Sequence, residues 1–247
     1  MTSLTNAKAL STFAVLGLFA LPTVAMADMT EGLYGTAQLG YSIADTDSKA
    51  YGNNIATDDD FPSSFEADNS MVGGIGLGYQ FNRNLRIEGR LAKRSFDIDD
   101  SRYGTGARDG EQYILDGEFE SLTMTLEGFY DFPISASFTP YAKAGIGLSK
   151  NDYSARLGGT GVAGFDAFDS KADGYYDNYA DGDSSEFTWN IGAGASYALT
   201  PSTHLYGEYQ YIDFGGDVQT GQDGFSDGFE INDASAHEFN LGLRYQF

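Results

Sequence analysis

Eight segments in which apolar and polar residues alternate with a period of two constrain this chain more than any other feature. In the first segment, Leu33 to Ile43, the odd-numbered positions are apolar or small, and their even-numbered partners Thr36, Gln38 and Ser42 are polar. The other segments follow the same rule and lie at residues 71–81, 85–91, 122–130, 141–148, 187–197, 205–211 and 239–247. Successive side chains of a strand point to opposite faces, so we expect eight strands that each have one apolar face.

The connections between these segments alternate in length. Those at residues 82–84, 133–139 and 200–202 are short, whereas those at 45–69, 97–118, 149–186 and 213–233 are long and polar. No apolar run after residue 27 is long enough for a membrane helix, but a tilted strand of about ten residues crosses a bilayer. Short turns at one end and long loops at the other are typical of outer-membrane barrels. The pattern predicts an all-β protein, an eight-stranded antiparallel transmembrane up-and-down β-barrel. A soluble β-sandwich, the alternative, would not show this alternation.

The acidic excess is confined to the long connections. The formal net charge is -22, and these four segments hold 28 of the 36 acidic residues. Charge is almost absent from the predicted lipid-facing side, where Lys93 lies near the end of its strand. This distribution favours a barrel in hydrocarbon with solvated loops outside it. The acidity makes nucleic acid a poor partner, because phosphates would be repelled. The absence of cysteine excludes disulfides and thiolate metal sites.

The first 27 residues are predicted to be a cleaved signal peptide, with the barrel domain at 28–247. A polar start containing Lys8 precedes the 13-residue apolar run from Ala9 to Leu21. Ala25 and Ala27 then form a small-x-small cleavage site. The run is too short to span a bilayer as a helix, and the three-part pattern is typical of export.

The side of each strand opposite the apolar one carries charges that would face the barrel interior. These residues are Arg86, Glu88, Arg90, Glu127, Lys143, Glu208, Glu238 and Arg244. Eight strands enclose an interior that side chains can fill, and unpaired charges there would be costly. We therefore predict a closed ion-pair network. The alternative is a narrow solute pathway, for which inward glycines would leave space; the same glycines would also let Tyr141, Tyr206 and Phe129 fit across the interior.

Catalytic and metal-binding patterns are weak. Neither His204 nor His237 lies at a spacing from a nucleophile and a third catalytic residue that would indicate a catalytic triad. We therefore predict no enzyme activity. The acidic runs Asp58–Asp60 and Asp169–Asp183 supply oxygen ligands but fit no calcium-loop spacing. We predict no cofactor, and weak divalent cation binding by the loops stays open. Their tyrosine, glycine and aspartate content suits contacts with an extracellular ligand that the sequence does not identify.

Four stretches, at residues 72–90, 140–149, 199–215 and 241–247, resemble the small outer-membrane β-barrel family. This family includes the OmpA transmembrane domain, the OmpX-like proteins and the opacity proteins. The resemblance implies an eight-stranded barrel in the outer membrane of a Gram-negative bacterium, in contact with membrane lipid and lipopolysaccharide. Leu243, Tyr245 and Phe247 resemble the signal that the barrel-assembly machinery reads. No peptidoglycan-binding domain follows the last strand, so an anchoring role is not implied.

These observations predict a monomeric surface protein with a structural or surface-interaction role, a sealed charged lumen and long acidic extracellular loops. A small porin-like diffusion channel is the alternative. An outer-membrane lipid hydrolase is a weaker one.

Overall fold

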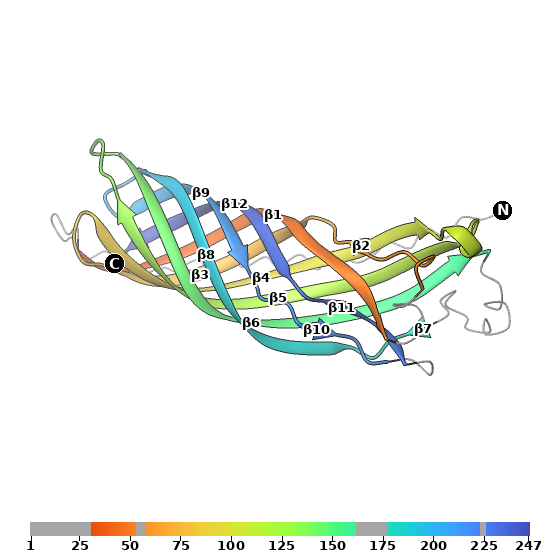
Figure 1. Cartoon of the computed structure of the whole chain (residues 1–247). Helices are drawn as coiled ribbons and strands as arrows, with labels where there is room; N and C mark the ends of the chain where they lie inside the picture. Colours follow the sequence, from red (N-terminus) through yellow and green to blue (C-terminus); the bar gives the residue numbers. More distant parts are fainter. Residues whose placement is uncertain (1–30, 53–57, 162–176, 223–225) are drawn as a thin grey trace, which may run out of the picture.

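The computed structural model describes residues 31–52, 58–161, 177–222 and 226–247, and it contains a closed antiparallel ring of eight strands (Figure 1). In ring order the strands are β1 (Gly32–Gly52), β3 (Ser70–Gln80), β4 (Leu85–Tyr103), β5 (Gln112–Asp131), β6 (Phe138–Thr160), β8 (Gly182–Ala198), β9 (Thr203–Asp213) and β12 (Ala234–Gln246). β1 pairs with both β3 and β12, which closes the ring. The predicted eight-stranded antiparallel barrel is confirmed. The predicted signal peptide, with Ala25 and Ala27, lies outside the described residues.

Three short turns gather at one end of the barrel. In the turn between β3 and β4, the side-chain oxygen of Asn82 accepts hydrogen bonds from the backbone N–H groups of Asn84 and Leu85. The ring also starts and finishes at this end, where the N–H of Phe247 donates to the carbonyl of Leu33 at 3.0 Å. We call it the turn end, and the opposite end, where the long connections lie, the loop end.

Toward the loop end the strands run much further than the sequence pattern predicts. β4, β5 and β6 have 19, 20 and 23 residues, about twice the length that crosses a bilayer. The prediction that residues 97–118 form one loop is therefore wrong, because β4 and β5 pair up to Tyr103 and Gln112. Only residues 104–111 connect them, with a short helix η2 (Gly106–Arg108).

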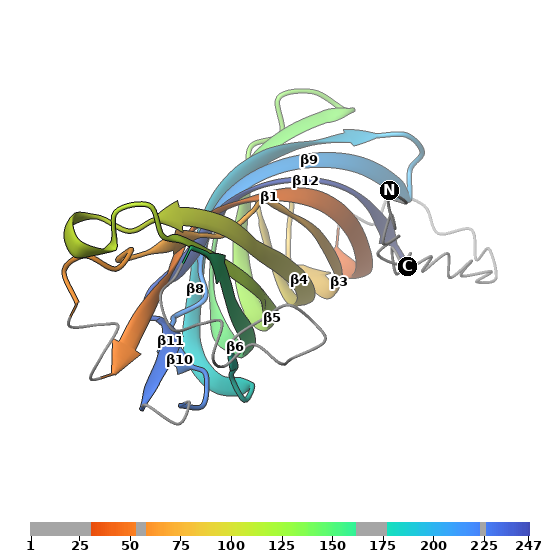
Figure 2. The same cartoon turned by 90° about the vertical axis from the view of Figure 1, so that its right-hand side faces the viewer.

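The other three long connections also contain strands. β1 continues into 45–69, β6 and β8 extend into the two ends of 149–186, and two short strands lie within 213–233. Short strands complete the loop end: β2 (Phe65–Glu66), β7 (Asp177–Asn178), β10 (Val218–Gln219) and β11 (Asp227–Ile231). β2 and β11 pair with β1, and β7 pairs with β6. Figure 2 views the molecule from this end and shows the extended strands spreading toward the viewer.

The extended strands keep their alternation but exchange the character of their two faces. In the turn-end half of β5, Leu126 is 59% exposed on the outer face and Glu127 is buried inside. In the loop-end half of the same strand, Leu115 and Phe119 are buried inside and Glu118 is exposed outside. The strand does not flip. The surroundings of the strand change instead. The turn-end half is suited to an environment that requires an apolar exterior, and the loop-end half is suited to water.

The exterior of the turn-end half is a belt of exposed apolar side chains on all eight strands. Leu39, Ile75, Leu126, Ile146 and Leu241 are each more than half exposed. Soluble monomers rarely expose an apolar surface of this extent, whereas the hydrocarbon-facing wall of a membrane barrel must. No helix among the described residues is long and apolar enough to cross a membrane.

The loop-end half has an apolar core of the kind found in soluble proteins. Phe96 of β4 stacks on Phe119 of β5 with ring centroids 6.1 Å apart. Phe65 of β2 packs against Phe229 of β11 at 5.9 Å, so the short strands contribute to the same core. The barrel therefore continues beyond its apolar belt as a second section, in which the apolar side chains face inward.

Candidate functional site

The inside of the turn-end half holds a compact ion-pair network around Arg90 of β4. Its guanidinium lies 2.9, 3.3 and 2.9 Å from the carboxylates of Glu88, Glu127 and Glu208. Lys143 of β6 lies 3.1 Å from Glu127 and 2.8 Å from Glu208. These five side chains are at most 4% exposed. The structure thus brings together five of the predicted interior residues, and they link β4, β5, β6 and β9 across the lumen.

Arg86 extends the network toward the turn end. Its guanidinium lies 3.2 Å from Asp131 and 3.8 Å from Glu88, and it stacks on the ring of Phe129 with 3.6 Å to the centroid. Asp131 was not predicted as an interior charge. It lies four residues after Glu127 and has the same parity, but the apolar alternation predicted that its strand ends at residue 130.

Glu238 belongs to a separate layer nearer the loop end. Its carboxylate pairs with Arg94 at 2.6 Å, and both side chains are fully buried. Gln210 also donates to Glu238, and the Arg94 guanidinium lies 4.8 Å from the centroid of the Phe214 ring. Arg94 was missed for a similar reason, because the alternation in its strand was followed only to residue 91. This layer joins the polar lumen to the apolar core above it.

Arg244 is the exception among the predicted interior charges. It is 9% exposed and points inward from β12, but no acidic side chain of the described residues lies within ion-pair distance. The prediction that the interior charges all pair therefore fails for Arg244.

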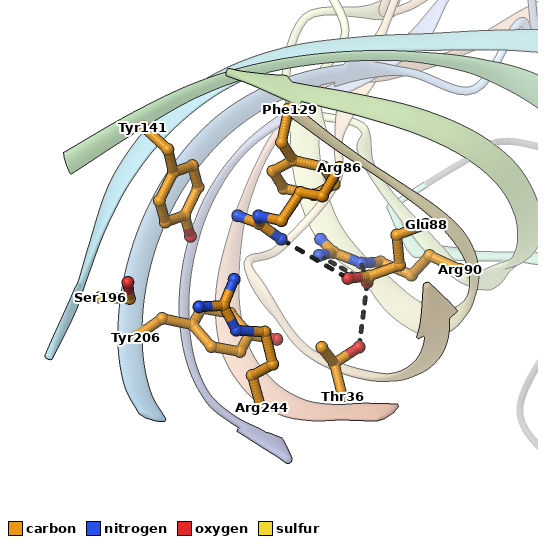
Figure 3. Close-up of a pocket in the computed structure, with 9 residues that line it drawn as sticks. All are labelled: Thr36, Arg86, Glu88, Arg90, Phe129, Tyr141, Ser196, Tyr206 and Arg244. Carbon is orange, nitrogen blue, oxygen red and sulfur yellow. Dashed lines mark hydrogen bonds and ion pairs between the residues drawn. The ribbon is translucent and has the colours of Figure 1, made fainter. Parts of the chain in front are cut away.

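Large side chains fill most of the remaining lumen. Tyr141 donates to Glu208 at 3.0 Å, and Tyr206 donates to Gln38 at 3.0 Å. Two inward glycines make room for them. A Cβ at Gly194 would lie 2.6 Å from the Tyr141 hydroxyl, and one at Gly242 would lie 2.4 Å from the Tyr206 ring. The glycines accommodate bulky partners here. The cavity left among these side chains, drawn in Figure 3, has room for about one water molecule.

The two histidines lie apart. His237 is on the outer face of β12, where its Nδ1 lies 2.8 Å from the Tyr209 hydroxyl, and its ring stacks with Tyr209. His204 lies near the turn end of β9, opposite Arg244 in register. They share neither a face nor an end of the barrel.

At the loop end, the aspartates predicted as weak cation ligands engage the β4–β5 connection. Asp58 pairs with Arg108 at 2.7 Å, and Asp60 accepts a hydrogen bond from the backbone N–H of Ala107 at 2.9 Å. The hydrogen bond from Arg108, and then the N–H of Asp60, hold the pKa of Asp58 below its usual value. No group of three or more acidic or histidine side chains in the described part of the chain is arranged to hold a metal ion. Residues 169–176 of the second acidic run lie outside that part.

Comparison with known proteins agrees with this architecture. The family described as outer membrane protein beta-barrel domain matches residues 11–247. Outer membrane protein PagN of Salmonella typhimurium is 26% identical, over 90% of this chain and 93% of that protein. An uncharacterized protein of Brucella abortus is 28% identical, over 70% of this chain and 67% of that one.

Solved structures with the same fold include OprG, an outer membrane protein of Pseudomonas aeruginosa. It has a TM-score of 0.51 at 15% sequence identity, and the match covers 89% of this chain and 100% of that one. Neisserial surface protein A has a TM-score of 0.46 at 19% identity, covering 87% and 97% of the two chains.

Proposed function

This chain belongs to the outer-membrane β-barrel family, and from that premise we propose that it is a non-conducting surface protein whose loop end binds a partner outside the cell. Proteins of this family lie in the outer membrane of Gram-negative bacteria, which accounts for the apolar belt. The turn end then faces the periplasm and the loop end faces outward.

The observation that carries the non-conducting role is that buried side chains occupy three successive levels of the barrel interior. A solute would first have to pass the network around Arg90, whose carboxylates and cations are buried and mutually paired. It would then meet the Arg94–Glu238 layer and, beyond it, the apolar core around Phe96 and Phe119. Breaking a buried ion pair without replacing it is costly, so transient opening is disfavoured.

The observation that supports a binding role is a set of like charges on the outer face of the loop end. Asp97 of β4 lies directly opposite Glu118 of β5, and Asp99 lies opposite Asp116. Like charges in directly opposite positions of a sheet destabilise it. Among the described residues, Arg156 of β6 pairs with Asp116 and so offsets the repulsion between Asp99 and Asp116. Such an arrangement favours a cationic partner surface, which would remove the repulsion on binding.

Single-channel recording of refolded residues 28–247 in a planar bilayer tests the first half of this proposal. We expect a silent membrane once folding is established by a heat-dependent mobility shift in detergent gels. Steady cation-selective steps that change in size in Arg86→Gln or Glu127→Gln would instead establish the diffusion channel.

Titration of vesicle-embedded protein with a lysine-rich peptide tests the second half. We expect saturable binding that weakens with salt and is lost in the triple variant Asp97→Asn, Asp99→Asn, Glu118→Gln. The matched control is Glu120→Gln, which removes one outward carboxylate of β5 that already pairs with Lys93 at 2.7 Å. Equal binding by the triple variant would refute the acidic face as the binding surface.

A catalytic role is not part of this proposal. A purified preparation that hydrolyses outer-membrane lipid, and loses this activity on His237→Ala, would contradict it.

A further inference from the structure

Arg244 combines deep burial with an incomplete set of partners. Its side chain is nine-tenths buried, and its Nε has no hydrogen-bond partner among the residues that the structure describes. The guanidinium lies 5.6 Å from the centroid of the Tyr34 ring, a contact that compensates a buried cation only in part. A buried charge without a counter-charge is strongly unfavourable, so this position favours an additional anion.

The cavity beside Arg244 has an excess of positive charge on its walls. Nine residues line it, of which three are arginines and one is a glutamate: Thr36, Arg86, Glu88, Arg90, Phe129, Tyr141, Ser196, Tyr206 and Arg244. The carboxylates that balance Arg90 and Arg86 include Glu127, Glu208 and Asp131, which lie outside this lining. In the described part of the chain, none of them lies within ion-pair distance of Arg244.

The single lining carboxylate is already engaged. Glu88 accepts a hydrogen bond from Thr36 at 2.9 Å and pairs with Arg90 at 2.9 Å. Figure 3 shows these contacts together with the ion pair between Arg86 and Glu88, and it shows the guanidinium group of Arg244 facing that of Arg86 across the cavity. The hydroxyl groups of Ser196 and Tyr206 donate elsewhere, to Thr139 and Gln38. The Nε and Nη1 of Arg86 donate to Asp131 and Tyr34, so the donors left for a ligand are those of Arg244 and the Nη2 of Arg86.

We propose that this cavity binds one small monovalent anion, chloride, between Arg244 and Arg86. The space accepts about one water molecule, so a single-atom ion such as chloride, which is only slightly larger than water, is the largest anion it can take, and sulfate or phosphate would not fit. A water molecule would satisfy the Nε hydrogen bond but not the charge, and chloride does both. The site is independent of the proposed surface role, since it lies at the turn end of the barrel.

Urea unfolding of the vesicle-embedded barrel in sodium chloride and in sodium gluconate, at equal concentration, tests this site. At a chloride concentration of ten times the dissociation constant, the folded-to-unfolded ratio rises by a factor of about eleven. We expect this chloride preference in the wild type and in the control Arg83→Met, which removes an exposed arginine of the β3–β4 turn. We expect no preference in Arg244→Met. Comparing variants in the same two salts cancels the general effects of each salt on the protein surface.

Equal stability of the wild type in the two salts, or a chloride preference that survives in Arg244→Met, would overturn the proposal. Crystals of the wild type soaked in bromide give a second measurement that does not depend on the folding of a variant. An anomalous peak between Arg244 and Arg86 supports the site, and a wild-type cavity without one shows that it holds water only.

Discussion

Replacing Arg94 by Met should destabilise the barrel far more than replacing its neighbour Lys93 by Met. The two residues are adjacent in β4, and each forms one close ion pair with a glutamate. The pair distances are nearly equal, 2.6 Å for Arg94–Glu238 and 2.7 Å for Lys93–Glu120. Burial is what differs: the Arg94 and Glu238 side chains are fully buried, whereas those of Lys93 and Glu120 are 50% and 37% exposed.

The expected magnitudes follow from this difference. Removing one partner of a buried ion pair costs about 3–5 kcal/mol, because the remaining charge is left buried and unpaired. Removing one partner of an exposed pair costs about 0–1 kcal/mol. Arg94→Met should therefore lower the folding equilibrium constant by a factor of about 150 to 5,000, and Lys93→Met by less than about tenfold. In the double variant Arg94→Met, Glu238→Gln the loss should shrink, since no unpaired charge remains.

The chain provides its own probe for this measurement. Trp189 is the single tryptophan, and it lies on the outer face of β8 at 39% exposure, so its fluorescence reports transfer from lipid to water. Urea titrations of the three variants in vesicles give the free energies of unfolding. Similar losses for Lys93→Met and Arg94→Met, or a double variant as unstable as Arg94→Met, would show that burial of the pair does not control its contribution.

Two further predictions concern the loop end. Leu115→Ala should lower the free energy of unfolding by about 2–5 kcal/mol, because Leu115 is fully buried in the apolar core. The lipid-facing control Leu126→Ala should lower it less. Equal losses of the two variants in urea titrations would contradict the core assignment. The pKa of Asp58 is lower in the folded protein than in the unfolded chain. Its stabilising contact with Arg108 is therefore fully present above the pKa of an unfolded aspartate, about 3.9. The contact is lost as the pH falls through the lower pKa of the folded protein. Pepsin cleavage of residues 104–111 in the wild type should therefore rise only at pH values below the usual aspartate range. The variant Arg108→Met should be cleaved readily at higher pH. Cleavage of the wild type already near pH 5 would refute this prediction.

The sequence predicted the membrane-crossing half of each strand because one parity there is apolar without interruption. It did not predict the loop-end half, although the alternation continues. In residues 95–99, Phe96 and Ile98 alternate with Asp97 and Asp99, but the apolar parity is now the one that carried charges in residues 86–90. A search for one constant apolar face stops at this exchange. A search for alternation alone would have continued through it.

The interior site was predictable in composition but not in its pairing. Parity along a strand identifies an inward side chain, and it placed Arg90 and Glu208 in the lumen. Which carboxylate meets which cation depends on strand tilt and register across the ring, and the sequence pattern does not specify them. For this reason nothing in the sequence distinguished Arg244, which forms no ion pair with another described residue, from Arg86, which forms two.

The exchange of faces occurs at one level on three neighbouring strands. Lys93 of β4 lies opposite Leu122 of β5, and Leu122 lies opposite Lys150 of β6. Below this row the outer face is apolar on all three strands. Above it, after one polar level that contains Arg94, the inner face is apolar from Phe96, Phe119 and Tyr153 onward. A common level across strands of different length is expected from a planar boundary between two solvents, and lysines at that boundary can extend their charge into water. Since the apolar side chains face the lipid below this boundary, the interior there is left to polar groups, which is why the ion-pair network lies in the membrane half and the apolar core lies outside it.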